Sequence, residues 1–105
     1  MDTRIALSTG GSRGLGKSTA LHLAAKGVDV ILTYRTRREE AEDVVAETRR
    51  FGRRAVALPL DAGKVAEFRQ FAKAVEAVLA TEWQRRQFDF LVNNAGIGIA
   101  DWARR

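Results

Sequence analysis

The glycine-rich segment at residues 9–16, Thr-Gly-Gly-Ser-Arg-Gly-Leu-Gly, does most to limit how this chain can fold. It follows a short apolar run at residues 5–7 that predicts a β-strand, and it precedes a helix-like stretch. Glycines permit positive φ and let the backbone approach a ligand closely, because no Cβ is in the way. The following helix directs unpaired N–H groups and a partial positive charge at the turn. The segment therefore predicts a strand, a turn and a helix that together hold the phosphates of a nucleotide.

Length and composition indicate one globular domain, residues 1–105. No apolar run approaches the ~20 residues of a membrane span, and no secretory leader is evident, so we expect no membrane association. The chain has no cysteine, which excludes disulfides and fits a cytoplasmic location. Its single histidine, His22, argues against a histidine metal site, and we expect no metal.

The formal charge of +5 raises the question of nucleic-acid binding. The arginines are scattered along the chain, however, and aromatic residues are not interleaved with them as a base-stacking surface requires. We therefore expect no nucleic-acid partner.

Strand-like and helix-like segments alternate along the whole chain. Strands are predicted at residues 4–8, 28–34, 55–60 and 88–92. Helices are predicted at residues 15–26, from a capping box at 36–39 to residue 51, and along an apolar stripe at 65–83. Gly27 and Gly52 are placed to end the first two helices, and Pro59 suits an edge strand. This order predicts an α/β fold, a Rossmann-like doubly wound parallel sheet with strand order 3-2-1-4 that stops after strand 4.

The glycine segment also fits a second pattern. Residues 11–18 satisfy GxxxxGK[ST], the phosphate loop of nucleoside triphosphatases. In that interpretation Lys17 reaches the phosphates, Ser18 holds Mg²⁺, and Asp61 is a second metal-binding acid. A glycine turn with no ligand is the third alternative.

Four segments favour a dinucleotide: TGGSRGLG at 9–16, TYRT at 33–36, LD at 60–61 and NNAG at 93–96. In order and spacing the chain resembles the short-chain dehydrogenase/reductase family across nearly its whole length. The resemblance implies an oxidoreductase that transfers hydride between a nicotinamide and a carbonyl or alcohol.

The resemblance also implies the residues that contact the cofactor. They are Gly10, Ser12, Arg13, Gly14, Leu15, Gly16, Tyr34, Arg35, Asp61, Asn93, Ala95 and Gly96. Arg13 and Arg35 match positions where the family uses basic residues for NADP, and Tyr34 stands where an NAD-binding fold would have an acid. We therefore expect NADP in preference to NAD. Asp61 resembles the family's adenine-contacting acid, and it could also cap the next helix.

The family's acid–base residues, a serine and a Tyr-x-x-x-Lys pair, have no counterpart in this chain. Its only tyrosine is Tyr34, the residue four positions on is Arg38, and the serines all lie around the first turn. No catalytic residue can be assigned, and we expect the polypeptide to be inactive by itself. A nucleotide-binding or interaction module without catalysis remains the alternative function.

The expected 3-2-1-4 sheet has helices 15–26 and 36–51 on one face and a single helix on the other. Its fourth strand is an apolar edge in which Asp89 is the one charged residue. An uncovered apolar face of several hundred Å² is rarely left in water by a monomer. We therefore expect a homo-oligomer, formed through the strand 4 edge or through the sheet face beside the single helix.

Overall fold

The computed structural model of the chain describes residues 3–10, 14–60 and 67–93. Strands and helices alternate along it as expected. The elements are β1 (Arg4–Thr9), α1 (Gly14–Ala25), β2 (Val28–Tyr34), α2 (Arg38–Arg50), β3 (Ala55–Pro59), α3 (Phe68–Val78), the π-helical turn η2 (Leu79–Trp83) and β4 (Phe90–Asn93). All neighbouring strands pair in parallel, in the order β3-β2-β1-β4. The predicted fold class and strand order are confirmed.

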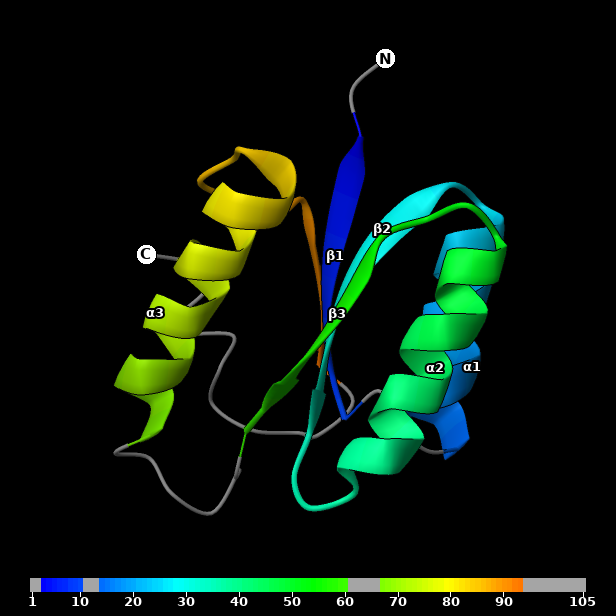
Figure 1. Cartoon of the computed structure of the whole chain (residues 1–105), viewed down its shortest axis with the longest axis horizontal. Coiled ribbons are helices and arrows are strands. Elements are labelled where there is room, and N and C mark those ends of the chain that lie inside the picture. The colour runs from blue at the N-terminus through cyan, green and yellow to red at the C-terminus, as the bar shows by residue number, and fades with distance from the viewer. Residues whose placement is uncertain (1–2, 11–13, 61–66, 94–105) are drawn as a thin grey trace.

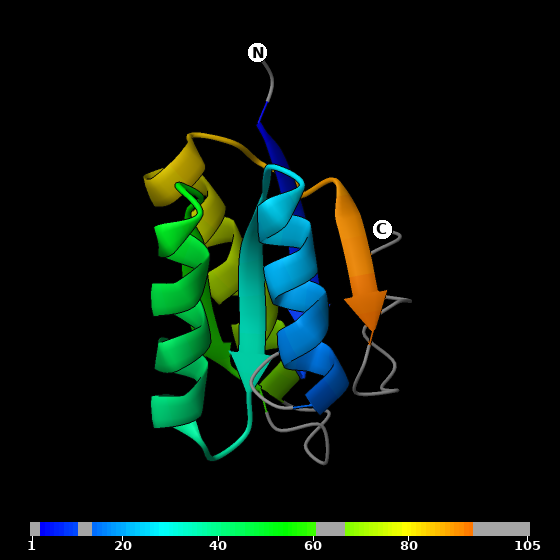
Figure 2. The same cartoon turned by 90° about the vertical axis from the view of Figure 1, so that its right-hand side faces the viewer.

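The sheet separates two layers of helices (Figures 1 and 2). Helices α1 and α2 lie side by side on one face, and α3 lies on the other. Successive strand residues point to opposite faces, so Ile5 and Leu7 of β1 pack with Phe71, Val75 and Leu79 on the α3 side. On the other side the core consists of Ala20, Val30, Leu32, Ala41, Val44, Val45 and Ala55. Both faces of β1 and β2 are buried, which explains their nearly continuous apolar sequence.

Two glycines end the first two helices, as predicted. Gly27 follows α1 with φ +86°, and Gly52 follows α2 with φ +80°. Both lie in the left-handed region that side chains with a Cβ avoid. The strand β3 forms an outer edge of the sheet and ends at Pro59, where the missing N–H costs no ladder hydrogen bond.

The capping box predicted at residues 36–39 is wrong. Helix α2 begins at Arg38, its N-cap residue is Arg37, and no side chain makes a capping hydrogen bond there. Arg37 has a non-helical backbone (φ −100°, ψ 68°), which places Thr36 outside the helix. The Arg37 guanidinium instead forms an ion pair with Glu40 at 3.1 Å.

Strand β4 begins two residues later than predicted, at Phe90 instead of residue 88. The main chain at Asp89 turns its N–H to the carbonyl of Ile5 at 2.7 Å, and Phe88 packs against the core on the α3 side. Phe88 therefore contributes to the core and not to an apolar edge. At the β4 edge, Phe90 remains 40% exposed. On the sheet face beside α3, the other expected association surface, Ile5 and Leu7 have no exposed surface. Association through the β4 edge stays a prediction.

The apolar stripe predicted at residues 65–83 forms α3 and η2, with Phe71, Val75 and Leu79 buried. Val65 lies outside the described residues. Among the helices that the structure does describe, none has the length and apolar composition needed to cross a bilayer.

A buried carboxylate connects η2 to the sheet. Asp29 of β2 is only 4% exposed, and its Oδ2 accepts a hydrogen bond from the Trp83 indole N–H at 2.7 Å. Its Oδ1 accepts the Arg54 backbone N–H at 2.9 Å and lies 3.9 Å from Nε of Arg53. Burying a carboxylate is costly unless donors surround it, and here they come from two other elements of the fold. These contacts fix the end of the α3–η2 segment against β2 and the start of β3.

Trp83→Phe should lower the free energy of unfolding by about 1–3 kcal/mol, because it removes one donor from a buried carboxylate. Urea denaturation followed by circular dichroism measures the change. Phe51→Leu is the control, since that aromatic side chain is 53% exposed and its loss should alter stability little. Equal midpoints for the two variants would contradict the role given to the indole N–H.

Candidate functional site

The carboxyl ends of β1, β2 and β4 meet at one edge of the sheet. In the register of the ladders, Ser8 lies beside Leu32 and Thr9 lies beside Asn93. The glycine-rich segment begins directly after β1, and α1 begins four residues beyond Gly10, at Gly14. In parallel α/β sheets, ligands bind in the crevice at this edge, beside strands whose connections run to opposite faces.

Gly10 begins the turn in a left-handed conformation, with φ +71°. Its backbone N–H donates a hydrogen bond of 2.8 Å to Oγ1 of Thr33, which lies at the end of β2 and is 2% exposed. The hydroxyl of Thr9 reaches the Val92 carbonyl of β4 at 3.4 Å. Side-chain hydroxyls therefore link three strands just below the turn. The sequence analysis assigned no role to Thr33, although it lies in the TYRT segment; a hydroxyl at the end of an apolar strand was the available signal.

The charge pattern of the helix that follows the turn favours an anion at its N-terminus. The first turn of α1 contains no acidic residue. The free N–H groups and the dipole of such a helix end attract an anion. Of the residues predicted to bind the cofactor here, Gly16 is buried in α1, and Gly14 is its first residue.

A cavity of about 360 Å³ lies at the same edge of the sheet, where β2 and β3 end beside α3. Its walls are formed by Arg35, Pro59, Leu60, Glu67, Gln70, Phe71 and Ala74. The Leu60 N–H donates to the carbonyl of Tyr34 at 2.8 Å, and this bond holds the chain after β3 against the end of β2. The cavity brings together the Arg35 guanidinium, the Glu67 carboxylate, the Gln70 amide and apolar surface beside the segment that leads to Asp61.

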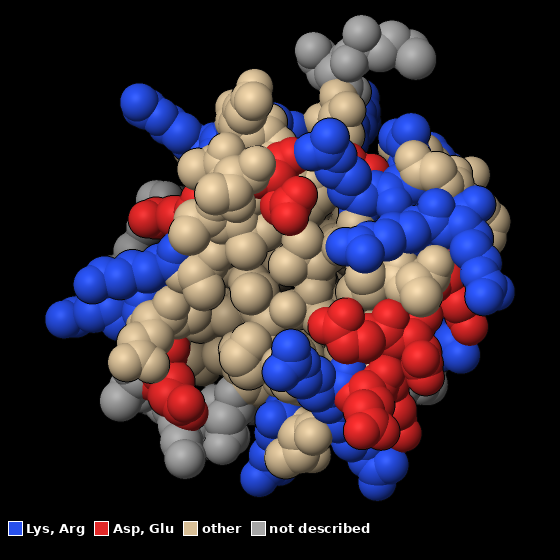
Figure 3. All heavy atoms as spheres, viewed as in Figure 1, with Lys and Arg blue, Asp and Glu red and all other residues tan. Residues whose placement is uncertain are grey.

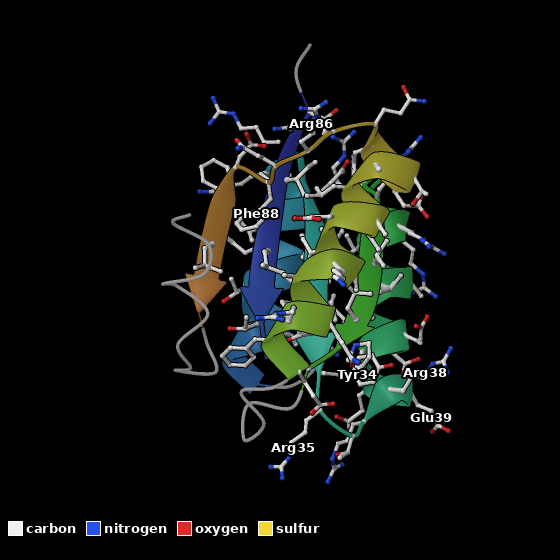
Figure 4. All side chains as sticks on the ribbon, turned by 90° about the vertical axis from the view of Figure 1, so that its left-hand side faces the viewer. Tyr34, Arg35, Arg38, Glu39, Arg86 and Phe88 are labelled. Carbon is white, nitrogen blue, oxygen red and sulfur yellow. The ribbon has the colours of Figure 1, made fainter. Side chains whose placement is uncertain are left out.

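Tyr34 and Arg35 diverge at the end of β2 (Figure 4). Tyr34 is half-buried and packs against the core on the α2 side, whereas Arg35 is exposed and lines the cavity. Arg38 and Glu39 of the first turn of α2 lie at the same end of the molecule. The position that would carry an acid in an NAD-binding fold is thus filled by a packed aromatic ring, with a cation next to it.

Lys17 points to a neighbouring helix. Its Nζ lies 3.7 Å from Oε1 of Glu47 on α2, and both side chains are partly exposed. In the phosphate-loop interpretation this ammonium would have to reach into the turn toward the phosphates. The ion pair with α2 therefore argues against that interpretation.

Several predicted contacts lie outside the described residues: Ser12, Arg13, Asp61, Ala95 and Gly96. Leu15 belongs to α1 and Asn93 ends β4, and for both only the backbone is described. These assignments, and the alternative that Asp61 caps the next helix, stay predictions. In the part of the chain that the structure describes, no group of three or more potential metal ligands occurs.

A second cavity, of about 610 Å³, lies at the opposite end of the sheet, where β1 and β4 begin. Arg85 donates hydrogen bonds to both carboxylate oxygens of Asp89, at 3.0 and 3.1 Å, and this holds the pKa of Asp89 below the ordinary aspartate value. The same carboxylate accepts the Ile5 N–H at 2.8 Å, and the Arg4 guanidinium lies 5.8 Å from the centre of the Phe90 ring. The polar groups around this cavity are thus bonded to one another, and their bonds connect the start of β1 to the start of β4.

Charged side chains form no single stripe on the face seen in Figure 3. Acidic side chains gather over α2, and basic ones lie at several separate places around the rim. Uncharged side chains occupy the middle, over α3 and the β3 edge. The absence of a nucleic-acid partner nevertheless remains a prediction.

Residues 4–104 match the model of a protein family described as short chain dehydrogenase. Because this match spans nearly the whole sequence, the chain belongs to the short-chain dehydrogenase family. Its sheet order and the placement of its glycine turn agree with that membership.

Individual relatives give the same result. The 3-oxoacyl-[acyl-carrier-protein] reductase of Synechocystis is 39% identical over 97 residues, which are 92% of this chain and 37% of that protein. Among solved structures, the promiscuous reductase LugOII, which catalyses keto-reduction at C1 during lugdunomycin biosynthesis, has a TM-score of 0.79 at 31% identity. That match covers 84% of this chain and 36% of LugOII. Acetoin dehydrogenase from Enterobacter cloacae has a TM-score of 0.74 at 33% identity, over 96% of this chain and 41% of the enzyme. The chain thus spans little more than a third of the length of these relatives.

Asp89→Asn should lower the free energy of unfolding by about 1 kcal/mol at neutral pH, because it weakens the Arg85 contact and the support of Ile5 N–H. A depressed pKa in the folded state contributes stability above the ordinary aspartate pKa. This contribution is lost as the pH falls through the lowered value. The difference in the free energy of unfolding between Asp89→Asn and the unsubstituted chain should therefore shrink as the pH is lowered.

Urea midpoints measured from about pH 7 down to about pH 3 test this dependence. Asp43→Asn, on the exposed side of α2, controls for the change in net charge. A difference that stays constant over the range would contradict the assignment.

Proposed function

We propose that residues 1–105 form the NADP(H)-binding part of a short-chain dehydrogenase/reductase, an oxidoreductase that acts on carbonyl or alcohol groups. The observation that carries this proposal is the juxtaposition at one sheet edge of the left-handed Gly10, the N-terminus of α1, whose first turn has no acidic residue, and the Arg35 cavity. The turn and the helix N-terminus suit the pyrophosphate, and the cavity suits the adenosine half of the dinucleotide.

The turn and α1 supply the phosphate site. No acid in the first turn of α1 opposes the positive helix end, and Gly16 there is buried. A pyrophosphate placed at this helix end is stabilised by the dipole and by direct N–H contacts. Gly10, Ser12, Arg13, Gly14, Leu15 and Gly16 are the residues that we assign to it.

The residues at the end of β2 contact the adenosine half of the cofactor in this proposal. Arg35 lines the cavity, and the neighbouring Tyr34 offers no carboxylate to repel a 2′-phosphate. A guanidinium suits a phosphate because its fork of donors can bind two oxygens. NADP is therefore favoured over NAD. We place the adenine near Asp61, with Asn93, Ala95 and Gly96 along the crevice.

The bound dinucleotide supplies or accepts the hydride. This chain contributes binding and orientation, since its single tyrosine packs beside α2 and the residue four positions on is Arg38. The proton transfer that accompanies hydride transfer needs a group placed next to the reacting oxygen. None of the described residues is such a group, so we assign the acid–base step to a part of the enzyme beyond these residues. Ketone reduction, which LugOII is reported to catalyse, is the reaction class that we favour.

NADP⁺ should bind the 105-residue chain at least tenfold more tightly than NAD⁺. Arg35→Ala should remove about a factor of ten from this preference, because charge-assisted contacts contribute roughly 1.5–3 kcal/mol. Calorimetric titration with both dinucleotides measures it.

Lys17→Ala is the matched control, since it removes one positive charge from the same end of the molecule but from a side chain that faces Glu47. Equal affinities for the two dinucleotides, or tighter NAD⁺ binding, would refute the assignment. A large loss in Lys17→Ala together with Mg²⁺-dependent ATP binding would support the phosphate loop instead.

The purified chain should oxidise NADPH no faster than background with a panel of small ketones. Positioned acid–base groups contribute about 10²–10⁴-fold, and we find none among residues 3–10, 14–60 and 67–93. A full-length reductase of the family, assayed in parallel, shows that the panel contains usable substrates. Steady NADPH oxidation by the chain, in a preparation free of host reductases, would instead show that the chain has catalytic residues of its own.

A further inference from the structure

Three hydroxyl side chains are buried at the end of the sheet that carries the glycine turn. Ser8 and Thr9 at the end of β1 have no exposed surface, and Thr33 near the end of β2 is 2% exposed. The rest of the buried surface of β1 is apolar. A hydroxyl removed from water destabilises a fold unless it forms hydrogen bonds, so each buried hydroxyl here calls for a bonding role.

Thr33 has a partner that identifies its role. Its Oγ1 accepts the Gly10 N–H at 2.8 Å, a bond between residues 23 positions apart in the chain. Gly10 is the residue at which the chain leaves β1, and its φ of +71° sets the direction of the turn. By contrast, buried Thr48 donates to the Val44 carbonyl of its own helix, which links no distant segments.

We infer that Thr33 is a positioning residue of the cofactor site: its buried hydroxyl fixes Gly10, the residue at which the chain leaves β1 toward the N-terminus of α1. This inference rests on the proposed function. The Gly10 N–H is engaged by Thr33 and therefore is not itself a donor to a phosphate. Its bond keeps the first residue of the turn in one conformation before the cofactor arrives.

The same hydrogen bond also connects the proposed phosphate-binding and adenosine-binding parts of the site. Thr33 is next to Tyr34 and two residues before Arg35, which lines the adenosine cavity. One hydrogen bond therefore holds Gly10 against the end of the strand that Arg35 follows. A preorganised site loses less conformational entropy on binding, and this gain appears directly in affinity.

Thr33→Val tests the inference, because valine keeps the shape of the side chain and removes the hydroxyl. We expect NADP⁺ to bind this variant about fivefold to tenfold more weakly in calorimetric titration, the range for one lost hydrogen bond. Thr33→Ser retains the hydroxyl and should bind within about twofold of the unsubstituted chain. Thr48→Val removes a buried hydroxyl of the same kind away from the site and should also leave affinity within about twofold.

The hydrogen bond can be measured in the unsubstituted chain as well. The Gly10 amide should exchange with solvent slowly in the cofactor-free protein and rapidly in Thr33→Val. Rapid exchange in the unsubstituted chain would overturn the inference even if Thr33→Val failed to fold.

The binding results separate the two proposals. A chain that binds neither dinucleotide overturns the proposed function, and the positioning role with it. If the chain binds NADP⁺ and Thr33→Val binds equally well, the positioning role alone is overturned. Equal losses in Thr33→Val and Thr33→Ser, or in Thr33→Val and Thr48→Val, would also overturn it, because packing or stability would then account for the effect.

Discussion

The parallel pairing of β1 with strands on both sides is the constraint on which the rest of the structure depends. Every residue of β1 from Ile5 to Thr9 is fully buried, between β2 on one side and β4 on the other. A strand in this position has no solvent-exposed face, so its buried residues are apolar or carry polar groups that form hydrogen bonds. It must also end at the sheet edge where its neighbours end. The glycine turn can lie beside the ends of β2 and β4 only because β1 is central.

The two ends of this sheet use buried polar groups for different purposes. Where the strands begin, Asp29 accepts hydrogen bonds from the Trp83 indole N–H and the Arg54 backbone N–H. These bonds attach η2 and the start of β3 to β2. Where the strands end, the Thr33 hydroxyl holds a backbone N–H of the turn. A carboxylate surrounded by donors stabilises the fold, whereas a neutral hydroxyl accepts the Gly10 N–H without adding negative charge near the N-terminus of α1. The buried carboxylate thus stabilises the packing of the elements at one end, and the buried hydroxyl orients a backbone group at the other.

Features governed by local sequence could be predicted well. The strand at residues 28–34 has the predicted limits, and Gly27 and Gly52 end their helices as expected, because positive φ next to an apolar run is a local signal. The helix start at Thr36 was predicted wrongly, since the motif does not reveal the non-helical backbone of Arg37. The links between Gly10 and Thr33, and between Asp29 and Trp83, join residues 23 and 54 positions apart. No periodicity encodes such contacts; they follow from strand register and helix placement.

The preference for NADP that we propose depends on how the side chains are arranged at the end of β2. Tyr34, the last residue of β2, packs toward α2, whereas Arg35, the first residue after the strand, lines the cavity beside α3. The Leu60 N–H supports this arrangement by bonding the Tyr34 carbonyl at 2.8 Å. A one-residue slip of β2 would move Tyr34 to the opposite face of the sheet. The register of β2, held by β1 and β3, therefore determines which side of the sheet Tyr34 occupies and keeps its ring out of the cavity that Arg35 lines.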